Sequence, residues 1–263
     1  MKNITELSNK CKDFLTEAAD RLAISSGFIK RQRKLKGYSF VQALVMGNIG
    51  NTDCSIEGMC QLLYEDSITI SKQGLDYRFT ESAVNFMRAV YEECLKFFRF
   101  EQRIDCGILK NFSNVMLLDS SNILLPESME ELYKGHGSGY PHKGRSAKSS
   151  IKLQTLYNYT TQTLNRVDIL QGIRSDQGYR DHLQEINSND LLIADLGYFV
   201  PESFKILSDK GAYFISRYKA DTNIYDLLGQ QLDLLRILEK VTSWQGKILL
   251  GKVARLPVRI IVN

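Results

Sequence analysis

The hydrophobic and polar positions of this 263-residue chain follow two different periods. Up to about residue 100, apolar residues recur at helical spacing, as Phe14, Ala18 and Leu22 do, and this pattern predicts a helical region. From about residue 106 the chain changes to short apolar runs separated by polar, glycine-containing turns, which predicts buried strands. We therefore expect an α/β chain (α+β mixed) whose helical part comes first.

Two of the apolar runs end on an acidic residue. Residues 115–118 read V-M-L-L before Asp119, and residues 191–194 read L-L-I-A before Asp195. If these strands are parallel neighbours, both carboxylates lie at the same edge of the sheet, where such sheets place their sites. Two adjacent acids repel each other unless a cation lies between them, and carboxylate oxygens suit Mg²⁺ or Mn²⁺. The alternative is that each aspartate is only a turn or cap residue.

The elements between and after these strands predict one α/β arrangement. A polar turn joins strand patterns over residues 151–159 and 165–172, which predicts a hairpin. The later elements that we expect are a short helix over 180–186, a helix over 201–210 and a strand over 211–217. The order strand, hairpin, helix, strand, helix, strand resembles the ribonuclease H-like fold, in which the first strand and a later parallel strand each supply a metal-binding aspartate.

The net charge of +4 is small, but the cations are unevenly distributed. Five cations occur within residues 30–36. The glycine-rich segment over 132–150 and the start of the next strand carry five more: Lys134, Lys143, Arg145, Lys148 and Lys152. Charge runs usually form solvated surface, and the alternative here is contact with nucleic-acid phosphates. The glycine-rich segment lies close in sequence to Asp119, where a bound phosphodiester would need to be neutralised.

Two helices before residue 80 resemble a helix-turn-helix. Ser55 is the candidate N-cap of the first helix, and Thr69 or Ser71 is the candidate cap of a short second one. The second helix and the turn after it expose polar residues that include Lys72 and Arg78. Many helical hairpins share this pattern, so an ordinary hairpin is the alternative to a DNA-binding motif.

The cysteine and histidine spacings argue against a disulfide framework and a zinc site. The five cysteines form no C-x-x-C pair, and the three histidines have no H-E-x-x-H spacing. We interpret His136, His142 and His182 as surface or DNA-facing residues. No apolar run approaches membrane-spanning length, and M-K-N-I-T-E-L is too polar for a signal peptide, so we expect a cytoplasmic protein that does not contact a membrane.

Four stretches carry a resemblance to a known family. They are L-L-D-S-S around Asp119, I-A-D-L-G-Y-F around Asp195, Y-F-I-S-R-Y-K over 213–219, and S-I-E-G-M-C-Q-L with I-S-K-Q-G-L-D-Y-R-F in the helical part. In this order they make the chain resemble the DDE transposases of bacterial insertion sequences, in particular the group with a Y-x2-R-x3-E-x6-K signature (insertion-sequence family four). The resemblance implies metal-dependent phosphoryl transfer on the ends of a double-stranded DNA element.

The resemblance also gives roles to individual residues. Asp119 and Asp195 would be catalytic and would hold Mg²⁺ or Mn²⁺ with a third acid. Arg217 and Lys219 are candidate contacts to the DNA backbone, with solvated strand-end charges as the alternative. A homodimer is implied because transposition pairs two DNA ends. With the basic segments included, the candidate DNA-binding residues are Lys30, Arg31, Arg33, Lys34, Lys72, Arg78, Lys143, Arg145, Lys148, Arg217 and Lys219.

The third acid of the signature is not found in the sequence. Glu239, in L-L-R-I-L-E-K, has Arg236 three residues before it instead of four, and Asp233 stands where the signature has tyrosine. We therefore do not assign Glu239 as catalytic. Residues 246–262 alternate as the strands of this family's β-rich insertion would. We expect the chain to end inside that insertion, as a fragment or as the product of an interrupted gene.

These observations predict three regions and one leading function. The regions are a helical DNA-binding domain over 1–105, a ribonuclease H-like catalytic domain over 106–220 and the start of a β-rich insertion over 221–263. The function is that of an insertion-sequence transposase that binds terminal inverted repeats and cleaves and transfers DNA strands. The alternatives are an inactive remnant that only binds DNA and another ribonuclease H-like nuclease. Trp244 is either a core or strand-edge residue or a stacking surface for an unpaired base.

Overall fold

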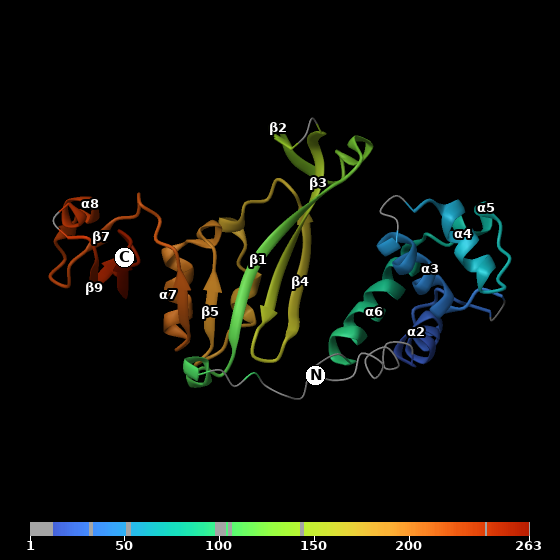
Figure 1. The fold of residues 1–263 in the computed structure, drawn as a ribbon, viewed down its shortest axis with the longest axis horizontal. Helices are drawn as coiled ribbons and strands as arrows, with labels where there is room; N and C mark the ends of the chain where they lie inside the picture. Colours follow the sequence, from blue (N-terminus) through green and yellow to red (C-terminus); the bar gives the residue numbers. More distant parts are fainter. Residues whose placement is uncertain are drawn as a thin grey trace. The chain divides into compact units, whose positions relative to one another are not determined.

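The computed structural model describes residues 13–31, 34–50, 54–97, 104, 107–142, 145–239 and 241–262. The chain forms two compact units, Met1–Arg99 and Phe100–Asn263, and Figure 1 shows helices in the first and strands with helices in the second. The predicted α/β class is therefore confirmed. Two of the expected DNA contacts, Arg33 and Lys143, lie outside the described residues, as does the side chain of Arg145.

Amphipathic helices build the first unit. They are η1 (Phe14–Ala18), α2 (Ala19–Ser25), α3 (Gly37–Gly50), α4 (Ile56–Glu65), α5 (Lys72–Asp76) and α6 (Glu81–Phe97). Their apolar faces meet in one core, whose most deeply buried large side chains are Phe40, Leu63, Leu75 and Phe86. The helical period of this region is thus realised as one packed cluster, because each helix must bury its apolar stripe against the others.

Serine caps fix the starts of α4 and α5, as the sequence predicted. The Ser55 and Ser71 hydroxyls accept hydrogen bonds from the backbone N–H groups of Gly58 and Gly74, each at 3.1 Å. α5 has only five residues, little more than one turn. The pair α4–α5 therefore does not present the multi-turn recognition helix that a helix-turn-helix inserts into the major groove.

Six strands form the larger sheet of the second unit. They are β1 (Val115–Leu124), β2 (Lys134–His142), β3 (Arg145–Asn158), β4 (Thr163–Gln171), β5 (Leu191–Ala194) and β6 (Tyr213–Ser216). Their order is β2-β3-β1-β5-β6, and β4 pairs with β3. β1 runs antiparallel to β3 but parallel to β5, and β6 is parallel to β5. The predicted parallel pairing of the two acidic strands is therefore confirmed.

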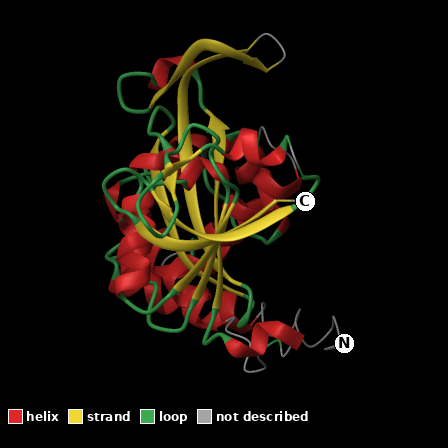
Figure 2. Ribbon diagram, turned by 90° about the vertical axis from the view of Figure 1, so that its left-hand side faces the viewer, coloured by secondary structure: helices red, strands yellow, loops and turns green. Residues whose placement is uncertain are grey.

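Two predicted elements differ in length from those observed. The apolar run of β1 ends at Leu118, but the strand continues to Leu124 because these later residues pair with β3. The helix expected over 180–186 is only a 3-10 turn, η5 (Asp181–Gln184). The glycine-rich segment forms the β2–β3 hairpin, which extends beyond β4, β5 and β6 (Figure 1, Figure 2). The other 3-10 turns are η2 (Gly107–Asn111), η3 (Glu127–Met129), η4 (Asp176–Gly178) and η6 (Leu196–Tyr198).

A smaller sheet follows β6. Its strand order is β10-β9-β7-β8. The four strands are β7 (Ile224–Tyr225), β8 (Gln231–Leu232), β9 (Trp244–Leu250) and β10 (Leu256–Val262). The helix α7 (Pro201–Asp209) lies between β5 and β6 in the chain, and α8 (Leu234–Leu238) lies between β8 and β9. Ile248 and Leu250 belong to the same buried cluster as Leu118 of β1, and Trp244 packs partly buried against it. Trp244 therefore packs against the core, which was one of the two roles that we considered for it from the sequence. None of the helices that the structure describes has the length and apolarity needed to span a membrane.

Candidate functional site

Asp119 and Asp195 lie level with each other on neighbouring strands. The parallel register pairs Leu118 of β1 with Ala194 of β5, so the next residue on each strand is an aspartate. Leu118 and Ala194 are buried, whereas both aspartates are exposed. This follows from the alternation of side chains along a strand: when one residue faces the core, the next faces away from it. The two acids therefore share the solvent side at the carboxyl edge of the sheet.

Arg217 completes this row of charges from the next strand. β6 pairs Ser216 with Ala194, which brings the following Arg217 level with Asp195. Its Nη2 and Nε donate to Asp195 Oδ1 at 2.6 and 3.2 Å. These hydrogen bonds, and one from the Leu196 backbone, hold the pKa of Asp195 below its usual range. Asp195 is therefore ionised at neutral pH, and Arg217, one of the expected DNA contacts, is paired with it.

The donor set at this edge fits a hard divalent cation in part. Mg²⁺ usually binds through one or two carboxylates and fills its remaining positions with water and substrate phosphates, and Asp119 and Asp195 provide two such carboxylates. Among the described residues, no cluster of three or more histidine, cysteine, aspartate or glutamate side chains is close enough to hold a metal. Glu239 follows α8 as its C-cap residue and is exposed. The structure thus gives no reason to add it to the pair.

A buried polar network lies on the opposite face of the sheet, beneath the two acids. Asp176 Oδ1 accepts hydrogen bonds from Ser120 Oγ at 3.0 Å, Lys152 Nζ at 3.0 Å and Gln154 Nε2 at 2.8 Å. The Lys152 side chain is only 5% exposed. We expected the cation of Lys152 to face a bound phosphodiester; that expectation is wrong, because this side chain is buried and its charge is balanced by Asp176.

The same network reaches the segment that follows Asp195. The Tyr198 hydroxyl donates to Gln154 Oε1, and a side chain on Gly197 would meet Asp176 Oδ2 at 3.3 Å. Burial raises the pKa of the Tyr198 hydroxyl, so it remains a proton donor. Sequence reasoning missed this network. The signal was present in β3, where polar Lys152 and Gln154 occupy alternate positions that share a face with buried Leu156.

His182 also differs from its sequence-based interpretation as a surface or DNA-facing residue. It is 3% exposed and lies between the rings of Tyr179 and Tyr198, with centroid distances of 5.4 and 6.3 Å. Burial lowers its pKa to about 4, and the positive charges of Arg180 and Arg166 act in the same direction. His182 is therefore a neutral core residue at pH 7.

The expected DNA contacts in the first unit separate into two groups. Lys30, Arg31 and Arg78 line one surface pocket, although the first two are 47 or more positions from the third in sequence. Lys34 and Lys72 are exposed but do not line that pocket. The structure thus brings three of the predicted cations together and leaves two apart.

The expected contacts in the second unit lie beside acidic residues. Lys148 pairs with Glu127 at 3.3 Å, and Lys219 lines a pocket that also contains Glu202 and Asp221. A phosphate would be repelled by the two carboxylates of that pocket. The positive charges that these two lysines carry are thus partly offset by neighbouring acids.

Comparison with known proteins was informative at the level of sequence. A family model for the transposase DDE domain matches residues 110–258, more than half of the chain. The transposase for insertion sequence element IS231F of Bacillus thuringiensis subsp. israelensis is 28% identical over 212 residues, 80% of this chain and 43% of that protein. The transposase for insertion sequence element IS1151 of Clostridium perfringens is 28% identical over 234 residues, 85% of this chain and 47% of that protein.

The chain therefore spans less than half the length of these curated relatives. Among solved structures, the piggyBac transposase synaptic complex with hairpin DNA is 11% identical to this chain and gives a TM-score of 0.38, over 79% of this chain and 50% of that one.

Proposed function

This chain belongs to the transposase DDE-domain family, and on that premise we propose that it carries two of the catalytic acids of a bacterial insertion-sequence transposase. The observation that carries the proposal is the level placement of Asp119 and Asp195 on adjacent parallel strands. The sheet supports assigning a ribonuclease H-like fold, because an antiparallel β4-β3-β1 half is followed by β5 and β6 parallel to β1.

The proposed chemistry follows from what these side chains can hold. Asp119 and Asp195 would bind Mg²⁺ or Mn²⁺ together with ligands from water and the DNA phosphate. When bound, the metal supplies Lewis acidity and lowers the pKa of the attacking hydroxyl or water. Arg217 balances the charge of Asp195 until then, and its guanidinium is placed to donate to a phosphate oxygen afterwards. Ser120 and Asp176 hold the backbone of β1 in place behind Asp119.

The substrate in this proposal is double-stranded DNA at the ends of a mobile element. Strand cleavage and transfer at terminal inverted repeats, and the pairing of two ends by a homodimer, extend the proposal from the family to this chain. The helical first unit would supply sequence-independent contacts to the DNA backbone through its cations.

Metal-directed backbone cleavage tests the placement of the two acids without requiring catalytic turnover. Fe²⁺ bound in place of Mg²⁺ generates hydroxyl radicals with ascorbate and peroxide, and these cut the nearest protein backbone. We expect cuts close to residues 119 and 195 that excess Mg²⁺ suppresses and that Asp119→Asn or Asp195→Asn abolishes. Asp209→Asn, which changes an exposed acid on α7, is the matched control and should leave the cuts unchanged. If cuts near residues 119 and 195 still form in both the Asp119→Asn and the Asp195→Asn variant, the proposed metal site is excluded.

A second candidate function is DNA binding without cleavage. It is favoured by one observation: Lys30, Arg31 and Arg78, three of the expected DNA contacts, line one surface pocket of the helical unit. Incubating the chain with supercoiled DNA and Mg²⁺ or Mn²⁺ distinguishes the two functions. Nicking that disappears in Asp119→Asn supports the transposase chemistry, whereas DNA binding with no nicking at any metal concentration supports the second function.

A further inference from the structure

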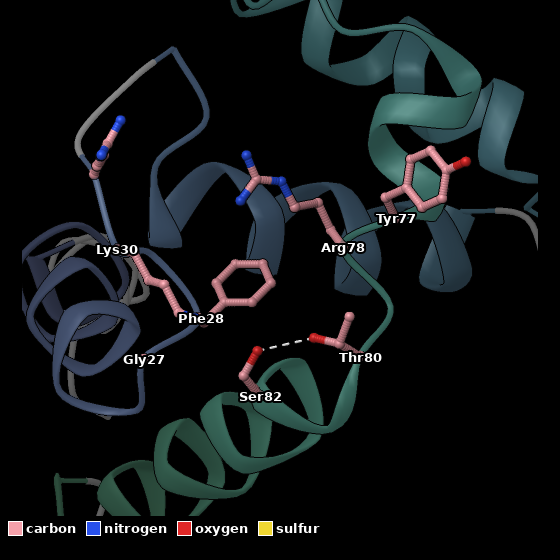
Figure 3. A pocket seen from close by; sticks show the side chains of 8 residues that line it. Gly27, Phe28, Lys30, Tyr77, Arg78, Thr80 and Ser82 are labelled. Carbon is pink, nitrogen blue, oxygen red and sulfur yellow. Dashed lines mark hydrogen bonds between the residues drawn. The ribbon is translucent and has the colours of Figure 1, made fainter.

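The first unit contains a basic pocket formed by two segments that are distant in sequence. One wall is the loop after α2, with Lys30 and Arg31, and the other is the connection between α5 and α6, with Tyr77 and Arg78 (Figure 3). The cavity has a volume of about 330 Å³. Since a water molecule occupies roughly 30 Å³ in the liquid, the cavity has room for a phosphate group together with part of its sugar.

The charges that line this pocket are all of one sign. Lys30 and Arg31 are exposed and Arg78 is half-buried, and Figure 3 shows the Arg78 side chain extending across the pocket toward the Lys30 loop. No carboxylate lines the pocket, and none of the described residues forms an ion pair with any of these three cations. Like charges held near one another repel, so the arrangement favours an anion between them.

Aromatic residues of the helical unit lie behind both walls of the pocket. α2 ends at Ser25, and Gly27, whose φ is +75°, turns the chain so that Phe28 enters the core two residues before Lys30. The Phe28 ring lies 4.7 Å from that of Phe40, and the ring of Phe79, next to Arg78, lies 5.6 Å from that of Phe40. Phe28 and Phe40 are buried, and Phe79 is 46% exposed. The two segments that carry the cations are therefore tied to each other through Phe40, which lowers the entropic cost of bringing them around a ligand.

Hydroxyl groups at the start of α6 provide uncharged donors to the same pocket. Thr80 and Ser82 line it, and their hydroxyl oxygens are 2.8 Å apart (Figure 3). The Thr80 carbonyl accepts the first hydrogen bonds of α6, from Ala83 and Val84, so the positive end of this 17-residue helix lies at the pocket. Cations, hydroxyl donors and a helix start together form the donor set that binds phosphate oxygens.

We propose that this pocket binds a backbone phosphate of duplex DNA through Lys30, Arg31 and Arg78. The inference rests on the proposed function, because it names the part of the helical unit that contacts the DNA. Tyr77 is 80% exposed at the rim, so a phosphate can enter while still attached to a duplex. The contact fixes the position of the DNA and is independent of base sequence. It also differs from the helix-turn-helix hypothesis, because two of the three cations, Lys30 and Arg31, follow α2 and lie outside the α4–α5 pair.

The test measures the affinity of the full chain for a fluorescent duplex by anisotropy at several KCl concentrations. Each neutralised phosphate contributes about −0.9 to the slope of log K against log salt, so Arg78→Gln should reduce the steepness of that slope by about 1. At 0.1 M salt this corresponds to roughly tenfold weaker binding. Arg78→Lys keeps the charge and should restore most of the slope, which a defect in folding would not allow.

Arg88→Gln is the matched control for net charge. Arg88 is an exposed arginine on α6 of the same unit that does not line the pocket, so its loss should leave the slope unchanged. Equal effects of the Arg78 and Arg88 changes would overturn the proposal in favour of diffuse attraction to a basic surface. Inorganic phosphate and adenosine monophosphate serve as competitors. If either binds the pocket at micromolar concentration without displacing the duplex, the pocket is a small-anion site and the proposal is wrong.

The outcome is separable from that of the catalytic proposal. Arg78→Gln should weaken duplex binding to the same extent in Mg²⁺ and in EDTA, because the pocket does not include Asp119 or Asp195. If the chain binds no duplex, the phosphate pocket is refuted while the Fe²⁺ cleavage result still stands. If the Fe²⁺ cuts are absent but Arg78→Gln lowers the salt slope, the pocket stands and the metal site fails.

Discussion

Substitution of Asp176 tests whether the buried polar network on the opposite face of the sheet stabilises the strands that carry the candidate site. Its Oδ1 accepts three hydrogen bonds, one of them from the ammonium of Lys152, whose side chain is 5% exposed. Asp176→Asn leaves that ammonium buried beside a neutral amide. Removing one partner of a buried ion pair costs roughly 3–5 kcal/mol. Because the Asp176 side chain is itself 25% exposed to water, we expect the lower end, about 3 kcal/mol of the free energy of unfolding.

Lys152→Met is the matched change on the other side of the pair. It removes the buried cation and leaves Asp176 with its bonds to Ser120 and Gln154 and with access to water, so it should cost about 1 kcal/mol, the size of one hydrogen bond. In the double variant no cation is left unpaired. Its cost should therefore be about 2 kcal/mol less than the sum of the single changes, which is the coupling energy of the pair.

Urea unfolding followed by tryptophan fluorescence measures these differences. Trp244 is the only tryptophan and packs against the core of the second unit, so its signal reports that unit separately from the helical one. The reasoning fails if the two single costs add in the double variant, or if Lys152→Met is the more costly change. Either result would mean that the Asp176–Lys152 pair does not stabilise the sheet in the way its geometry indicates.

Two further predictions concern the two cores. Burial lowers the pKa of His182 from 6.5 to about 4. Between these pH values the unfolded chain binds a proton at His182 that the folded chain does not bind. The free energy of unfolding of the second unit should therefore decrease by up to about 3 kcal/mol as the pH falls through this range. His182→Phe should remove that part of the pH dependence of urea unfolding; an unchanged profile would contradict it. Gly37→Ala would bring a methyl group within 2.5 Å of Ala23 Cβ and should destabilise the first unit by about 1–3 kcal/mol in thermal circular dichroism. In Gly58→Ala the added Cβ would lie 3.4 Å from its nearest neighbour, Cys54 Sγ, so this change should leave the stability of the first unit unchanged or increase it. Equal losses of stability in the two variants would refute the packing argument.

The two acids were predictable because local pattern and strand geometry point the same way. The apolar runs before Asp119 and Asp195 predict buried strands, and parallel pairing then places the next residue of each at one edge. The serine caps of α4 and α5 were predictable for a similar reason, since a cap is satisfied by a backbone N–H only three residues away. Wherever the determining contacts are local, the sequence alone was sufficient.

Which cations remain on the surface depended on contacts that no local pattern contains. Lys152 belongs to a basic segment in sequence, yet the turn containing Asp176 covers it and supplies its counter-charge. Lys30 and Arg78 line one pocket although they are far apart in sequence, and Phe28 and Phe79, which lie close to them in the chain, both contact the ring of Phe40. Tertiary structure decided these positions because side chains alternate between the two faces of a strand, and only packing determines which face or which loop a distant segment covers.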